Sequence, residues 1–90
     1  MEFSGHAMEK MRKRGVNVAH VYNTLESPKE LFEDIEHDVM VAIKKVDDKF
    51  VIVVFREEDG VVKVITLYYT TKFERLVKSK MVRGAWKRIK

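Results

Sequence analysis

The side chains best suited to chemistry in this chain are histidines, arginines, lysines and tyrosines, because the sequence contains no cysteine. That absence excludes a disulfide framework, thiolate ligands for zinc and thiol catalysis. His6 is a candidate general acid or base, since an imidazole titrates near neutral pH; its alternative role is to cap or pack at a helix start. His20 and His37 are interpreted as surface residues. The spacing of the three histidines matches no metal-ligand motif, so neither a metal nor a cofactor is predicted.

The basic C-terminal tail is a second candidate. Residues 72–90 contain eight Lys or Arg residues and one acid, Glu74, so they carry +7 and leave −3 on residues 1–71. Basic groups bind phosphates and aromatic rings stack on bases, so the tail predicts contact with RNA. The residues expected to make it are Lys72, Arg75, Lys78, Arg83, Trp86, Lys87 and Arg88. The alternative is an amphipathic helix with a solvated basic face and Trp86 in the core.

Length and composition describe the setting of these residues. Ninety residues with 46% hydrophobic content predict one globular domain over residues 1–90. The longest apolar run, residues 50–55, is far shorter than the ~20 residues of a membrane span, and no signal peptide is visible, so the predicted location is the cytoplasm. The 36% charged content and the lack of Gln favour a thermophilic source. Residues 26–38 carry a net charge of −5, opposite in sign to the tail.

Two short helices are predicted in residues 1–28. Ser4 is a plausible N-cap for a helix that runs to about Arg14, and Gly15 provides its stop. Asn17 is a plausible N-cap for a second helix, which ends before Pro28. Together they form a helical hairpin.

Residues 30–69 predict four antiparallel strands, at 30–36, 39–46, 49–56 and 61–69. They are rich in β-branched residues, and their connections are too short for parallel crossovers. The turns are expected at residues 37–38, 47–48 and 59–60. A basic helix or extended tail over residues 72–90 completes the predicted α+β domain.

Alternation along the strands predicts two apolar sheet faces. The N-terminal helices are expected to cover the face that carries Val39, Val41, Ile43, Phe50, Ile52, Val54, Ile65 and Leu67. The tail is expected to cover part of the face that carries Met40, Ala42, Lys44, Val51, Val53, Phe55, Val62, Val64, Thr66 and Tyr68. A second copy of the chain or a partner peptide is the candidate cover for the rest of that second face.

The opening of the chain resembles a family of small prokaryotic proteins. The residues that carry the resemblance are Phe3-Ser4-Gly5-His6-Ala7-Met8, Met11, Arg14-Gly15-Val16, Val21, Leu25 and Pro28, followed by the strand Val64-Ile65-Thr66-Leu67-Tyr68. The resemblance covers about residues 3–70. In the order of its elements that family is similar to the BrnT-like and RelE/ParE-like toxins of toxin–antitoxin systems.

This resemblance implies a metal-independent endoribonuclease or an RNA-binding protein that an antitoxin-like partner holds inactive. RelE-like enzymes use scattered Lys, Arg and Tyr side chains, so Arg14 and Tyr68 are expected to hold the phosphate, with His6 as the proton carrier. For Arg14 the alternatives are a favourable charge at a helix C-terminus or an ion pair to the sheet. The alternative function is a non-catalytic module that dimerises or binds an antitoxin-like partner through the open sheet face.

Overall fold

A computed structural model describes all 90 residues of the chain. It contains three helices and one six-stranded mixed sheet. In chain order the elements are β1 (Glu2–Phe3), α1 (Gly5–Arg14), α2 (Val18–Glu26), β2 (Glu30–Asp34), β3 (Val39–Val46), β4 (Lys49–Glu58), β5 (Val61–Thr70), α3 (Phe73–Val82) and β6 (Trp86–Arg88).

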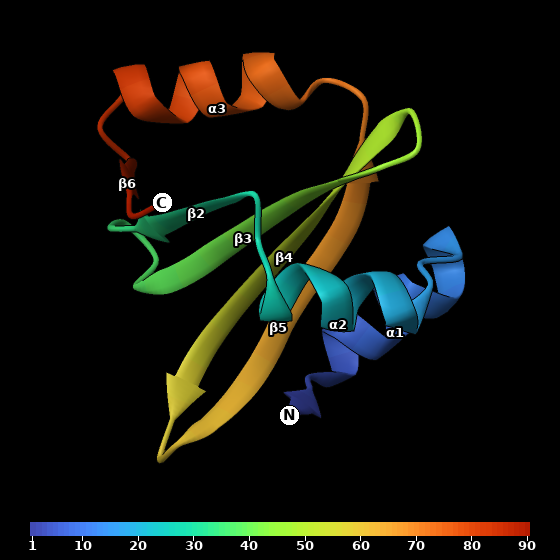
Figure 1. The fold of residues 1–90 in the computed structure, drawn as a ribbon. Coiled ribbons are helices and arrows are strands. Elements are labelled where there is room, and N and C mark those ends of the chain that lie inside the picture. The colour runs from blue at the N-terminus through green and yellow to red at the C-terminus, as the bar shows by residue number, and fades with distance from the viewer.

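The strands lie in the order β1-β5-β4-β3-β2-β6, so β1 and β6 form the two edges of the sheet (Figure 1). All neighbouring strands are antiparallel except β1 and β5, which are parallel. The predicted α+β class is confirmed. The predicted four-stranded antiparallel meander is wrong, because β1 pairs with β5 and the end of the tail pairs with β2 as a further strand.

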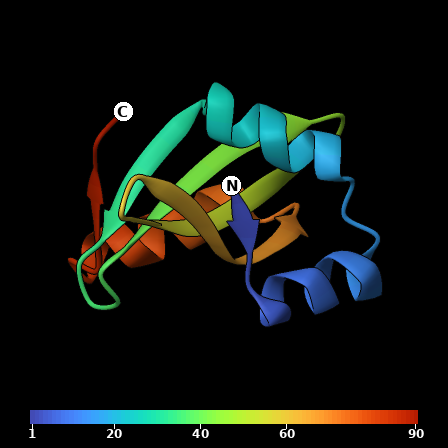
Figure 2. The ribbon, with the colours of Figure 1, turned by 90° about the horizontal axis from the view of Figure 1, so that it is seen from below.

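The helix ends follow the capping residues in the sequence. The Ser4 hydroxyl accepts a hydrogen bond from the Ala7 N–H at 3.0 Å and donates one to the Ile65 carbonyl at 2.8 Å. Gly15 ends α1 with φ of 62°, a left-handed conformation that glycine adopts at little cost. The Asn17 side chain accepts from the Ala19 N–H at 2.8 Å and begins α2. Figure 2 shows the two helices joined by a short link.

The strand register is set by two tight turns and one bulge. Val46 pairs with Lys49, and Glu58 pairs with Val61, which confirms the two-residue turns at 47–48 and 59–60. Further along β5, Phe55 pairs with Val64 but Val54 pairs with Thr66, so Ile65 is the extra residue of a β-bulge.

The bulge reverses the sheet face of every later residue in β5, because side chains alternate with a period of two. Leu67 now pairs with Val53, and Tyr68 pairs with Ile52. The predicted assignment of Leu67 to the Ile52 face, and of Thr66 and Tyr68 to the Val53 face, is therefore wrong.

The two faces of the sheet carry separate hydrophobic cores. Under α1 and α2 the core contains Ala7, Val16, Val21, Val51, Val53, Val64 and Leu67. On the other face, which α3 covers, the core contains Phe32, Val41, Ile43, Ile52, Val77, Ala85 and Trp86. The helices thus cover the faces opposite to those predicted. Alternation identifies the residues that share a face, whereas the side on which α1 lies follows from the hydrogen bonds of Ser4 to Val64 and Ile65 on β5.

The tail occupies the acidic side of the molecule. The basic strand β6 pairs with the acidic strand β2, with Glu33 opposite Lys87 and Asp34 opposite Trp86. Two ion pairs join the tail to this region, from Arg83 to Glu36 at 3.2 Å and from Arg88 to Glu30 at 2.6 Å. None of the helices has the length and apolarity needed to span a membrane.

Candidate functional site

A cavity of about 400 Å³ opens on the sheet face that bears α3, beside the β2–β3 turn. Its lining residues come from four strands, β2 to β5, and from this turn, and none comes from α3. They are Asp34, His37, Val39, Val54, Arg56, Ile65 and Thr66. A titratable pair and a guanidinium therefore share a wall with short apolar side chains.

Asp34 is a buried carboxylate with several donors. It is only 7% exposed. One oxygen accepts from the His37 backbone N–H at 3.0 Å, and the other accepts from the Trp86 Nε1–H at 3.2 Å. Burial by itself raises the pKa of Asp34, but the hydrogen bonds from His37 and Trp86 outweigh this effect and hold the pKa below its ordinary value. Asp34 is therefore an anion near neutral pH.

The His37 ring is oriented by this carboxylate. Its Nδ1 lies 3.0 Å and 3.1 Å from the two Asp34 oxygens. Since an ionised carboxylate only accepts hydrogen bonds, Nδ1 carries the proton and Nε2 of the neutral ring is left as an acceptor. With 66% of its side chain exposed, His37 can meet a ligand. This arrangement of carboxylate and imidazole is that of a general base held in one tautomer.

Arg56 is fixed next to this pair. Its Nε donates to the Asp38 carbonyl at 3.2 Å, and one Nη donates to the His37 carbonyl at 3.4 Å. Its other Nη lies 3.5 Å from a Glu58 oxygen, an ion pair at the end of the hairpin. The contacts hold a permanently charged, planar group at the cavity wall, and such a group suits a phosphate.

Arg14 and Tyr68, both predicted in catalysis, do meet. The Arg14 guanidinium carbon lies 5.9 Å from the centroid of the Tyr68 ring. Burial raises the pKa of Tyr68, and the nearby charge of Arg14 opposes this only partly, so the hydroxyl stays protonated at neutral pH. Tyr68 is two residues beyond Thr66 on the same sheet face, which places it roughly 7 Å along β5 from the cavity.

His6 does not join them. It lies exposed in the first turn of α1, whereas Arg14 is the last residue of that helix. Eight residues of α-helix separate the two by about 12 Å.

The sequence interpretation missed Asp34 and His37 as a functional pair. An aspartate three residues before a histidine in a strand–strand turn is a usable signal, since aspartate caps such turns with its side chain.

The structure divides the predicted RNA-binding tail into three groups. Trp86 is buried against Phe32 and bonded to Asp34, so the prediction that it stacks on a base is wrong. Arg83 and Arg88 are engaged in ion pairs with acids of the β2 region. The other four cations, Lys72, Arg75, Lys78 and Lys87, are exposed and take part in no ion pair.

The side chains around His37 also have donor atoms suited to a metal. Atoms of Asp34, Glu36 and His37 lie within 4.8 Å of one another. Both carboxylates already have partners, however, since Asp34 binds His37 and Trp86 and Glu36 binds Arg83. A metal ion at this position has to displace those contacts.

Comparison with known protein families matches residues 3–69 to a domain of unknown function, DUF4258. The chain belongs to the DUF4258 family. The match includes Asp34, His37, Arg56 and Tyr68 and ends before α3 and β6. No curated protein and no solved structure matches the chain.

Proposed function

We propose that this DUF4258 protein binds single-stranded RNA and cleaves it without a metal, in the manner of the RelE-like and BrnT-like toxins. The observation that carries the proposal is the Asp34–His37 pair, which leaves Nε2 of His37 free beside a cavity that also contains Arg56. A general base next to a guanidinium is what metal-free cleavage of a phosphodiester requires.

In the proposed reaction RNA supplies its own nucleophile. His37 Nε2 takes the proton of the ribose 2′-hydroxyl, and the 2′-oxygen forms a bond to the adjacent phosphorus. The bond from phosphorus to the 5′-oxygen breaks, and that oxygen takes a proton from the Tyr68 hydroxyl. The products are a 2′,3′-cyclic phosphate and a 5′-hydroxyl end, and water later returns the protons to their starting positions.

The charges around the cavity support this assignment of roles. Arg56 and Arg14 stabilise the negative charge that grows on the phosphate oxygens, since a guanidinium is always ionised. Burial raises the pKa of Tyr68, which keeps the proton on its hydroxyl, and the nearby charge of Arg14 favours the anion that forms when this proton is donated. Asp34 holds the imidazolium that forms after proton transfer, as a buried anion should.

The test compares two exposed histidines of the same chain. The purified protein is incubated with single-stranded RNA in EDTA, and the products are separated on a gel. Cleavage is expected for the unchanged protein and for His6→Ala, and it should be lost in His37→Ala. Equal cleavage by both variants, or cleavage that EDTA abolishes, contradicts the proposed chemistry. A salt-sensitive RNA complex without any cleavage indicates a non-catalytic RNA-binding protein instead.

The toxin function has its own experiment. Expression in a bacterial host should arrest growth, and His37→Ala should relieve the arrest. An adjacent reading frame that encodes a small DNA-binding protein is expected to supply the antitoxin-like partner. Unimpaired growth on expression of the unchanged chain removes the toxin part of the proposal and leaves RNA cleavage to the gel assay.

A further inference from the structure

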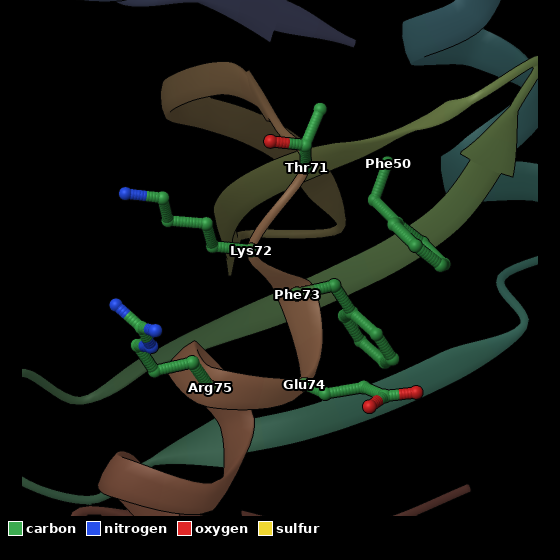
Figure 3. Close-up of a pocket in the computed structure, with 6 residues that line it drawn as sticks. All are labelled: Phe50, Thr71, Lys72, Phe73, Glu74 and Arg75. Carbon is green, nitrogen blue, oxygen red and sulfur yellow. The ribbon is translucent and has the colours of Figure 1, made fainter.

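A second polar cavity lies at the junction of β5 and α3, away from the Asp34–His37 pair. Its volume is about 270 Å³, and its six lining residues are Phe50, Thr71, Lys72, Phe73, Glu74 and Arg75 (Figure 3). Figure 3 shows the Thr71 hydroxyl, the Lys72 ammonium and the Arg75 guanidinium pointing to one side, whereas the Glu74 carboxylate points to the other.

The cations of this cavity are available to a ligand. Neither Lys72 nor Arg75 is among the residues of the five ion pairs in the chain. A neighbouring cavity of about 360 Å³ shares Thr71 and Lys72 and adds Lys49. The Lys49 ammonium lies 4.1 Å from the centroid of the Tyr69 ring. Three cations and hydroxyl groups thus line two neighbouring hollows that share Thr71 and Lys72.

The backbone beneath these cations is held by packing. The rings of Phe50 and Phe73 are stacked with their centroids 4.3 Å apart, and they join the start of α3 to β4. The Lys72 N–H donates to the Thr70 hydroxyl at 3.0 Å. The junction is therefore fixed even though the charged side chains are exposed, which lowers the entropy lost when a ligand binds.

The junction also lies in line with the proposed cleavage site. β5 continues from Thr66 to Thr70, about 13 Å of strand, before the chain bends at Thr71, and Tyr68 with Arg14 beside it lies on this stretch. A strand of RNA that passes the first cavity and follows β5 therefore arrives at the second.

We propose that Thr71, Lys72 and Arg75 form a phosphate subsite for the same RNA strand, several nucleotides from the bond that is cleaved. This inference rests on the proposed function. The subsite contacts backbone phosphate and no base edge, so it binds all sequences and its contribution falls with added salt. Its place fixes the path of the RNA along β5.

The experiment uses the His37→Ala protein, so that bound RNA is not consumed. Its affinity for a fluorescent single-stranded oligonucleotide is measured over a series of salt concentrations. The double variant Lys72→Ala/Arg75→Ala is compared with Lys78→Ala/Lys87→Ala, which removes the same charge from two exposed positions outside both cavities. The logarithm of the RNA association constant falls linearly with the logarithm of the salt concentration, and each lost phosphate contact makes this line shallower by about 0.7.

The expected result is a slope reduced by about 1.4 for the first double variant, with a much smaller change for the second. Equal changes in the two variants overturn the subsite while RNA binding itself stands. If the parent protein binds no RNA, the proposed function and the subsite fail together. With the His37 side chain intact, Lys72→Ala/Arg75→Ala should raise the RNA concentration needed for cleavage by a larger factor for a long oligonucleotide than for a dinucleotide. An equal effect on both substrates also overturns the subsite.

Discussion

Replacing Trp86 by Phe tests the buried contact that orients the candidate base. The change removes the Nε1–H that donates to Asp34 at 3.2 Å and keeps an aromatic ring beside Phe32. A hydrogen bond to a charged group contributes about 1.5–3 kcal/mol, so we expect the free energy of unfolding at pH 7 to fall by about 2 kcal/mol. For a domain of this size that loss lowers Tm by about 8–16 °C.

The same variant has a predicted pH dependence. The folded pKa of Asp34 lies below its ordinary value of 3.8, so the ionised carboxylate stabilises the fold at pH above 3.8. This stabilisation is lost as the pH falls through the folded pKa. Because Trp86→Phe removes one of the bonds that lower the pKa, the stability difference between the two proteins should be largest near neutral pH and shrink in acid.

Urea unfolding followed by circular dichroism is the suitable assay, since the variant removes the only tryptophan. The smaller ring also loses packing contacts, so the variant is combined with Asp34→Asn in a double-mutant cycle. A coupling of about 1 kcal/mol between the two positions is expected at pH 7. A coupling near zero at pH 7, or a stability difference that does not shrink as the pH falls through the folded pKa of Asp34, refutes the role of this bond.

Three further predictions concern other parts of the chain. His37→Ala should lower the rate of RNA cleavage by about 10²–10⁴-fold, the usual contribution of a general base, whereas His6→Ala should keep the rate of the unchanged protein. Gel assays under single-turnover conditions measure both rates, and a similar loss in the two variants contradicts the role of His37 as the base. Deleting Ile65 removes the bulge but leaves Thr66 opposite Val54 and Leu67 opposite Val53, so we expect thermal unfolding to stay cooperative; loss of the cooperative transition disproves the register argument. Gly15→Ala should lower the free energy of unfolding by about 1 kcal/mol, because φ of Gly15 is 62° and alanine is strained in that conformation. In the same urea titration Gly5→Ala should be nearly neutral, and equal stabilities of the two variants contradict this prediction.

The local structure of this chain follows from its sequence to a large extent. Ser4, Gly15 and Asn17 mark helix ends because each satisfies or redirects backbone groups close by in the chain. The turns at residues 47–48 and 59–60 set the pairing of their flanking residues for the same reason. These features depend on a few neighbouring residues, which a sequence pattern displays directly.

The sequence-based predictions were wrong where segments far apart in the chain meet. The bulge at Ile65 has no glycine or proline to mark it, and its carbonyl is bound by Ser4 from the other end of the domain. The β6 strand is found only when the acidic strand β2 is recognised as its partner. Arg14 and Tyr68 meet although 54 positions separate them. The pairing of Asp34 with His37 has the sequence pattern of an ordinary turn, and only the cavity beside it, which distant strands form, indicates a site.

The sheet has a short strand at each edge, and the charge of one edge affects how copies of the chain meet. Strand β6 is three residues long and is flanked by further positive charge, with Lys87 and Arg88 in the strand and Lys90 just after it. An open edge invites another strand to pair with it, and like charges placed opposite each other resist such pairing. Two molecules that approach each other through β6 therefore repel, and this repulsion acts where the unpaired backbone groups of the edge would meet. The basic end of the tail thus protects the protein against edge-to-edge aggregation, and this protection should weaken as salt is added.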